Sequence, residues 1–368
     1  METTEKITLG VVFGGASSEH EISCLSAASV LANLDPARYR VLPVGITKGG
    51  LWFVYTGEVQ SVENGAWEQD AEHLLPCVIS PCTATHGLFV LDKAAGTFRV
   101  EKLDCVFPVV HGENCEDGKL QGLLALSGIP FVGCDTLSSA VTMDKVTTKL
   151  LLSSYGIPQA KWTLVYRHEL AAGEEKAIAR VEAALPYPVF VKPSGTGSSF
   201  GVSRAANREE LSRALGDAAQ YDEKILIEEE ICGSEVEVAL LERVGEDGRK
   251  TLQASTPGEI VPDGEFYDYE AKYVKGTSRC LAPAGISASA AERVRMYAKQ
   301  IFSALGCAGF SRADFFVSGE KIIFNEINTI PGFTAISMYP KLFGYDGIAY
   351  PELLNILVDS ARNTGARA

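Results

Sequence analysis

The chain begins with an apolar run that ends at a pair of glycines. This run, Ile7 to Phe13, is followed by Gly14-Gly15, as expected of a buried parallel strand that leads into a turn. Apolar side chains then recur at helical spacing from Ser18 to Leu34, and Tyr39 to Ile46 predicts a second strand. A strand, helix and strand of these lengths predict a parallel sheet with a right-handed crossover. This unit indicates the α/β class.

The composition excludes several classes of protein. The 368 residues are 46% hydrophobic and 22% charged, which is typical of a folded globular chain of two or three domains. No apolar run approaches the roughly 18 residues that span a bilayer. Lys and Arg number 33 and Asp and Glu 47, a net charge of −14 that disfavours nucleic-acid binding. We therefore expect neither a membrane nor a nucleic-acid partner.

The cysteines and histidines indicate a reducing compartment and no zinc. Nine cysteines lie between Cys24 and Cys307 without a Cys-x-x-Cys pair, as in cytosolic proteins with reduced thiols. The five histidines lack zinc-binding spacing. The segment from Met1 to Thr8 carries acidic residues and lacks the basic stretch followed by an apolar stretch that is typical of a signal peptide. These features predict a cytoplasmic protein.

The pattern divides into three regions, which we take as domains at 1–133, 134–228 and 229–368. Helices are expected at 144–155 and 207–219, the second capped by Asn207 with Glu210. A further helix is expected to begin at the capping box formed by Ser289 and Glu292. The stretch from about 257 to 283 shows no clear period but carries several aromatic residues, so we interpret it as a lid.

A glycine- and serine-rich turn follows a strand that ends in Lys192. Residues 191–201 read VKPSGTGSSFG, and such a loop lets backbone N–H groups approach an anion while the lysine adds a charge. A plain hairpin turn is the alternative. Gly197-x-Ser199-x-Gly201 also matches a hydrolase nucleophile elbow, but no helix is expected directly after the serine. The glycine spacing fits neither a dinucleotide fingerprint nor, at 112–119, a Walker A loop.

Two polar stretches are expected to pair as strands. Arg312 and Asp314 lie two residues apart, as do Glu326 and Asn328, and a turn at 318–319 separates the stretches. If the strands pair, two carboxylates and an amide share one face, and such hard oxygen ligands suit Mg²⁺ held together with phosphates. We place Phe324 on the same face, which disfavours the alternative of a solvated hairpin.

A third polar cluster, at 14–23, lies at the first strand-to-helix turn. Glu19 is the acidic residue of interest there. Ligands favour the carboxyl end of a parallel strand. The alternative to a ligand-binding role is that the carboxylate of Glu19, in the first turn of the expected helix, only offsets the positive end of the helix dipole.

Taken in this order, the segments resemble the D-alanine–D-alanine ligase family of the ATP-grasp superfamily over nearly the whole chain. The matching motifs are Gly14-Gly15 to Ser23, His111-Gly112 with Glu116 to Gly122, Met143-Asp144-Lys145, Val191 to Ser199, Phe266 to Tyr273, Arg312-x-Asp314 and Glu326 to Gly332. The resemblance implies a three-domain ATP-grasp architecture. Its N-terminal domain would be a Rossmann-like parallel sheet, and its ATP-binding part would be α+β.

The family's nucleotide and metal contacts carry over to named positions. ATP would be bound by Lys145, Lys192, Ser199, Glu228, Glu229, Ile231, Glu235 and Lys272, with Glu228 on the ribose and the segment to Ile231 at the adenine. Two Mg²⁺ ions, for which Mn²⁺ could substitute, would be held by Asp314, Glu326 and Asn328.

The resemblance also implies the substrate contacts. Glu19 would pair with the ammonium of the first D-alanine and be linked through Ser198 to Tyr273 on the lid, with His111 nearby. Arg312 and the Gly332 N–H would stabilise oxyanions, and Ser337 and Met338 would line the second D-alanine site. The product would be the D-alanyl-D-alanine used in peptidoglycan synthesis, and a homodimer is expected.

Three positions bear on the choice within the family. Cys115 stands where the family usually has glycine, which leaves the conformation of that loop open. Tyr273 and Met338 favour D-alanine over D-lactate and D-serine as the second substrate. A D-alanine–D-serine or D-alanine–D-lactate ligase stays the alternative, ahead of a silent nucleotide-binding regulator and a nicotinamide dehydrogenase.

Overall fold

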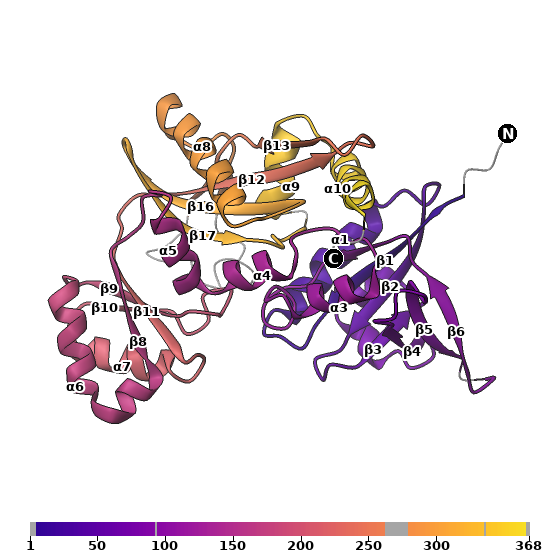
Figure 1. Cartoon of the computed structure of the whole chain (residues 1–368), viewed down its shortest axis with the longest axis horizontal. Helices are drawn as coiled ribbons and strands as arrows, with labels where there is room; N and C mark the ends of the chain where they lie inside the picture. Colours follow the sequence, from indigo (N-terminus) through magenta and orange to yellow (C-terminus); the bar gives the residue numbers. More distant parts are fainter. Residues whose placement is uncertain (1–4, 93, 262–278, 335, 366–368) are drawn as a thin grey trace.

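Three sheets organise the chain (Figure 1). The computed structural model describes residues 5–92, 94–261, 279–334 and 336–365. The first sheet lies at the lower right of Figure 1, the second at the lower left, and the third above both. Among the helices of these residues, none has the length and apolarity needed to cross a bilayer.

The first sheet has seven strands in the order β6-β5-β4-β3-β2-β1-β7. The expected crossover is confirmed, because β1 (Ile7–Gly14) pairs in parallel with β2 (Tyr39–Ile46) and with β7 (Cys105–Pro108). Helix α1 (His20–Asn33) makes this crossover. The remaining strands are antiparallel, so the expected parallel sheet is in fact mixed. They are β3 (Trp52–Tyr55), β4 (Leu74–Ile79), β5 (Gly87–Asp92) and β6 (Thr97–Lys102), with the short helices α2 (Val59–Glu63) and η1 (Ala66–Gln69) between them.

The second sheet is antiparallel, in the order β10-β9-β11-β8. Its strands are β8 (Trp162–Tyr166), β9 (Val189–Pro193), β10 (Ser203–Ala205) and β11 (Lys224–Glu229). Helices α6 (Arg167–Ala184) and α7 (Arg208–Ala218) pack on it around a separate apolar core. The side chain of Asn207 accepts the N–H of Glu210, so the predicted cap of α7 is confirmed.

The third sheet is also antiparallel. Five of its strands follow the order β15-β14-β12-β16-β17, and the sixth, β13, pairs with β12. The strands are β12 (Ser234–Val244), β13 (Lys250–Ala254), β14 (Gly258–Val261), β15 (Arg279–Leu281), β16 (Phe310–Ser318) and β17 (Lys321–Asn328). The ends of the expected lid therefore belong to the sheet, since β14 pairs with β15. Residues 262–278 lie outside the described residues.

Helix α8 (Ala288–Ala304) covers one face of this third sheet. Its cap is Ser287, whose hydroxyl accepts the N–H of Ala290, so the prediction of Ser289 as the cap is wrong. Ser287 has the extended backbone that a cap requires, whereas Ser289 is already helical. The pattern alone could not choose between two serines two residues apart.

The first and third sheets share one apolar core through α9 (Met338–Tyr345) and α10 (Tyr350–Thr364). Phe107 of β7 contacts Phe310 of β16 and Phe333 edge-on, at centroid distances of 6.2 and 5.8 Å. Burying an aromatic side chain stabilises a fold by about 1.5–3 kcal/mol. These contacts fix the N-terminal sheet against the hairpin of β16 and β17, which carries Asp314 and Glu326.

The linking helices α3 (Lys119–Ser127), α4 (Thr136–Met143) and α5 (Lys145–Ser153) lead from the first sheet to the second. Leu152 and Ile157 pack in the core of the third sheet rather than that of the second. The domain limits at 133 and 228 stay proposals, and this packing favours grouping 134–157 with the third sheet.

Candidate active site

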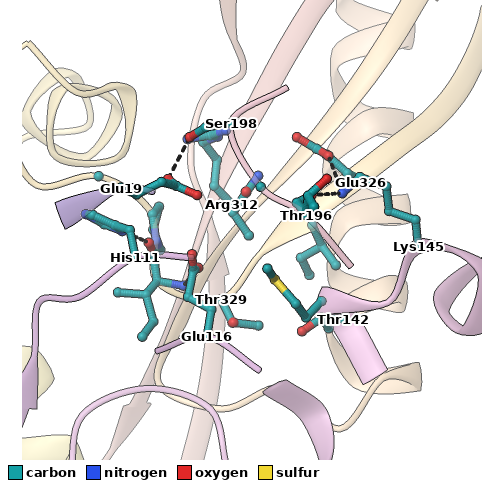
Figure 2. A pocket seen from close by; sticks show the side chains of 17 residues that line it. Glu19, His111, Glu116, Thr142, Lys145, Thr196, Ser198, Arg312, Glu326 and Thr329 are labelled. Atoms are coloured by element: carbon teal, nitrogen blue, oxygen red, sulfur yellow. Dashed lines mark hydrogen bonds and ion pairs between the residues drawn. The ribbon is translucent and has the colours of Figure 1, made fainter. Parts of the chain in front are cut away.

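Two cavities meet between the three sheets. The larger, about 810 Å³, lies between the second and third sheets, and the smaller lies between the first and third. They share five lining residues: Lys145, Thr196, Gly197, Ser198 and Glu326. Figure 2 shows the smaller cavity, with Glu19 and Ser198 at one end and Lys145, Thr196 and Glu326 at the other. A molecule in each cavity would meet its neighbour at these shared residues.

Glu19 and Ser198 link the first sheet to the glycine-rich loop. The Ser198 hydroxyl donates to Glu19 Oε2 over 2.6 Å (Figure 2). Ser198 and Ser199 have φ of 47° and 60°, a left-handed conformation that costs free energy and is often found at functional sites. A Cβ at Gly197 would stand 2.4 Å from Glu19 Oε1. The loop therefore fits around the carboxylate only with glycine at that position.

His111 is buried beside Glu19 and holds a neighbouring loop. Its Nδ1 lies 3.0 Å from the carbonyl oxygen of Ile330, and its own carbonyl accepts the Ser17 hydroxyl. Burial lowers the pKa of His111 to about 4, so the ring is neutral near pH 7. His111 lines the smaller cavity, where its lowered pKa makes it a neutral imidazole.

Glu116 lines the same cavity, and no role was assigned to it from the sequence. Its two carboxylate oxygens accept the N–H groups of Gly112 and Ile330, at 2.8 and 3.2 Å. Burial, together with the charge of Glu19, raises the pKa of Glu116 to about 8. Its place in the quoted Glu116 to Gly122 motif was the only signal in the sequence.

Arg312 and Asp314 form a paired charge on β16. The guanidinium donates to both oxygens of Asp314, at 2.8 and 2.7 Å, and also lies 3.0 Å from Glu237 Oε2. Asn328 Nδ2 lies 3.0 Å from Asp314 Oδ2. Glu237, on β12, was missed because nothing in the sequence marks the strand that pairs with β16.

The predicted pairing of the two polar strands is confirmed, with Arg312 opposite Asn328 and Asp314 opposite Glu326. The expected position of Phe324 is wrong. A bulge at Asn325 of β17 makes Phe324 pair with Phe315, and the two rings pack at 5.9 Å in the core. The extra residue in the bulge lets the Phe324 ring pack into the core although it lies two residues from Glu326, which the spacing in the sequence could not show.

Asp314, Glu326 and Asn328 offer the oxygen ligands that the Mg²⁺ prediction requires. Among the described residues, no group of three or more His, Cys, Asp or Glu side chains is placed so that it could hold a metal ion by itself. Two carboxylates and an amide nonetheless fit Mg²⁺, which is usually held by one or two carboxylates together with substrate phosphates. The donor set therefore fits a metal that arrives with a nucleotide.

Lys192 and Glu228 lie in the larger cavity with Lys149 beneath them. The two oxygens of Glu228 are ion-paired with Lys149 and Lys192, at 2.6 and 2.8 Å. These two ammonium groups hold the pKa of the buried Glu228 at about 2, despite its burial, and the pKa of Lys192 is raised by Glu228. Lys145 donates to the carbonyl oxygen of Thr196 at 2.6 Å and lies 3.9 Å from Glu326.

The remaining predicted residues divide into two groups. Ser199, Glu229, Ile231 and Glu235 line the larger cavity beside Glu228. Ser337 and Met338 line neither cavity: the Ser337 hydroxyl accepts the Thr334 N–H, and Met338 is buried in the shared core. Tyr273 and Lys272 lie outside the described residues.

Cys115 is compatible with its loop. It is buried, and a Cβ added at Gly15 would stand 2.7 Å from its sulfur. Its φ is not positive, so the position does not require glycine. The cysteine fills space that the neighbouring Gly15 leaves open.

Known proteins match this chain over nearly its whole length. Residues 8–134 match the family model described as D-ala D-ala ligase N-terminus, and 151–359 match D-ala D-ala ligase C-terminus. The chain belongs to the D-alanine–D-alanine ligase family. It is 45% identical to the D-alanine–D-alanine ligase of Acetivibrio thermocellus, over 95% of this chain and 94% of that one. It is 46% identical to that of Ruminiclostridium cellulolyticum, over 97% and 95%.

Solved structures of the family have the same fold. The VanG D-Ala:D-Ser ligase from Enterococcus faecalis has a TM-score of 0.86 and 40% identity, covering 97% of this chain and 100% of that one. The D-alanine–D-alanine ligase from Coxiella burnetii has a TM-score of 0.81 and 32% identity, covering 98% and 96%. The ATP-grasp architecture predicted from the motifs is therefore confirmed, and family membership implies the use of ATP and a divalent metal.

Proposed function

We propose that this chain joins two D-alanines into D-alanyl-D-alanine for peptidoglycan synthesis, with ATP converted to ADP and phosphate. The observation that carries the proposal is the meeting of the two cavities at Lys145, the 196–198 turn and Glu326. A nucleotide in the larger cavity would present its terminal phosphate there to a carboxylate in the smaller one.

The first step activates a carboxylate. A D-alanine carboxylate does not react with an amine, because its leaving group would be an oxide; its acyl phosphate reacts readily. Lys145 and Lys192 would neutralise the ATP phosphates as the phosphoryl group is transferred, so the catalysis is mostly positioning and charge neutralisation. Asp314, Glu326 and Asn328 would hold Mg²⁺, which neutralises phosphate charge when bound. We propose two ions.

Glu19 would bind the ammonium of the first D-alanine, held in place by Ser198. The amine of the second D-alanine then attacks the acyl phosphate, and phosphate leaves. Arg312 and the Gly332 N–H would stabilise the oxyanion. The predicted link to Tyr273 and the predicted contacts of Lys272, Ser337 and Met338 remain part of the proposal.

We revise the expected role of Glu228 within this proposal. Since Lys149 and Lys192 engage both of its oxygens, we assign it to holding Lys192 rather than to the ribose. Glu235, which lines the same cavity, would then bind the ribose, with Ser199, Glu229 and Ile231 around the nucleotide.

A thermal shift experiment tests the nucleotide class. ATP with Mg²⁺ should raise the melting temperature, and NAD should not. Stabilisation by NAD alone would contradict the proposal. Competition among D-alanine, D-serine and D-lactate tests the second substrate: preference for D-serine would move the chain to the activity named for the Enterococcus relative. A homodimer, testable by light scattering, and a cytoplasmic location belong to the same proposal.

A further inference from the structure

The loop that follows β17, Ile330–Phe333, is held from the N-terminal sheet; we call it the acceptor loop. The Ile330 N–H donates to Glu116 Oε1 at 3.2 Å, and His111 Nδ1 lies 3.0 Å from the Ile330 carbonyl oxygen. At the other end, the Phe333 N–H donates to the Ser26 hydroxyl at 3.3 Å. The side chains of Ser26, His111 and Glu116 thus hold a loop that is distant in the sequence, since Phe333 lies 307 residues after Ser26.

Ile330 sets the tautomer of His111, and Ser26 hydrogen-bonds the other ring nitrogen. The Ile330 carbonyl can only accept, so Nδ1 of His111 carries the proton and Nε2 is the acceptor. Ser26 Oγ lies 3.2 Å from Nε2, so its hydroxyl donates there while its oxygen accepts the Phe333 N–H. One fully buried hydroxyl, with no exposed surface, therefore connects the imidazole to the far end of the acceptor loop.

The contacts at both ends of the loop leave the backbone of its middle, at Pro331 and Gly332, beside the smaller cavity. Phe333 packs against Phe310 and Tyr339 at 5.6 and 5.3 Å, and its carbonyl oxygen accepts the Tyr350 hydroxyl at 2.6 Å. The N–H and C=O of both Ile330 and Phe333 are thus hydrogen-bonded. Between them lie Pro331, which has no N–H, and Gly332, which lines the smaller cavity.

We propose that Ser26 and Glu116 are positioning residues that hold the Gly332 N–H at the oxyanion of the amine-attack step, Ser26 acting in part through His111. The proposal rests on the ligase function proposed above. A loosened acceptor loop slows attack by the second D-alanine. The acyl phosphate is then lost to water, returning D-alanine and phosphate, so ATP is consumed without dipeptide.

The test compares Ser26→Ala with Ser360→Ala. Ser360 is a matched control on α10: it is also buried, and its hydroxyl accepts a backbone N–H, that of Val244, at 3.1 Å. Phosphate release and dipeptide formation are measured together with saturating ATP, Mg²⁺ and D-alanine. Ser26→Ala should lower kcat about tenfold and raise the ratio of phosphate to dipeptide above one, and Ser26→Cys should restore part of both. Ser360→Ala should keep the ratio at one.

The ratio separates positioning from a folding defect, which lowers the amount of active enzyme without changing coupling. Glu116→Gln provides a second variant, because its amide cannot accept both the Gly112 and the Ile330 N–H, and it should uncouple as well. A ratio of one in both variants, at near-normal kcat, overturns the inference. A wild-type protein that forms no dipeptide overturns the ligase proposal itself.

Discussion

Ser198 and Glu19 lie 179 residues apart in the chain and are joined by a 2.6 Å hydrogen bond. The contact ties the glycine-rich loop, which lines both cavities, to the turn that begins α1. A carboxylate held in this way is ready for an ammonium group, with little side-chain ordering left to do on binding.

The closeness of Gly197 to Glu19 predicts the effect of a single methyl group. In Gly197→Ala the Cβ would displace the Glu19 carboxylate, so KM for the first D-alanine should rise about tenfold while KM for ATP changes little. Gly216→Ala on α7 is the control, since a Cβ there meets nothing within 4 Å. Equal KM values in wild type and Gly197→Ala would refute the role of Glu19.

Removing Lys192 should abolish turnover without unfolding the protein. In Lys192→Ala, Glu228 keeps its ion pair with Lys149, so the buried carboxylate is not left alone. The expected loss in kcat is at least about 100-fold, because a phosphate-neutralising charge is gone. Circular dichroism and melting temperature check the fold, and Lys176→Ala, on the exposed face of α6, serves as the charge-loss control. Near-normal turnover would exclude Lys192 from the phosphate site.

The neutral His111 predicts a pH dependence of stability. Its pKa falls from 6.5 to about 4 on folding, so between these values the unfolded chain takes up a proton that the native protein does not. Stability should therefore fall as the pH drops from 6.5 to 4, by about 3 kcal/mol for this group. The difference in melting temperature between wild type and His111→Gln should narrow over that window. A difference independent of pH would contradict a buried neutral ring.

Asp314→Asn should weaken the coupling of metal and nucleotide. One ligand charge is lost, and Arg312 keeps Glu237 as a partner. The Mg²⁺ concentration needed for ADP to raise the melting temperature should increase at least about tenfold, a readout that requires no turnover. Asp247→Asn, at an exposed turn, should leave it unchanged. An unaltered Mg²⁺ dependence in Asp314→Asn would remove Asp314 from the metal ligands.

Local pattern was enough to predict the parts of the fold that rest on local physics. The crossover at β1–α1–β2 follows from apolar periodicity, and the Asn207 cap follows from side-chain chemistry. The antiparallel strands between Leu51 and Lys102 were missed because they are short and several are partly exposed, so they lack a clear apolar period. The choice of Ser287 over Ser289 depends on backbone geometry that composition does not encode.

For the site, the sequence identifies residue types but not the contacts between distant segments. The Arg312–Asp314 and Glu326–Asn328 pairing could be predicted because both strands belong to one hairpin. Glu237, Ser26 and Lys149 could not, because each reaches the site from another element through tertiary packing. Phe324 was misplaced because a one-residue bulge reverses the strand face.

Incubating the wild-type protein with ATP, Mg²⁺ and D-alanine tests the proposed ligase activity most directly. The product is identified by mass while phosphate release is followed. We expect D-alanyl-D-alanine with one phosphate released per dipeptide. ATP and Mg²⁺ binding without any dipeptide or ADP would contradict this expectation.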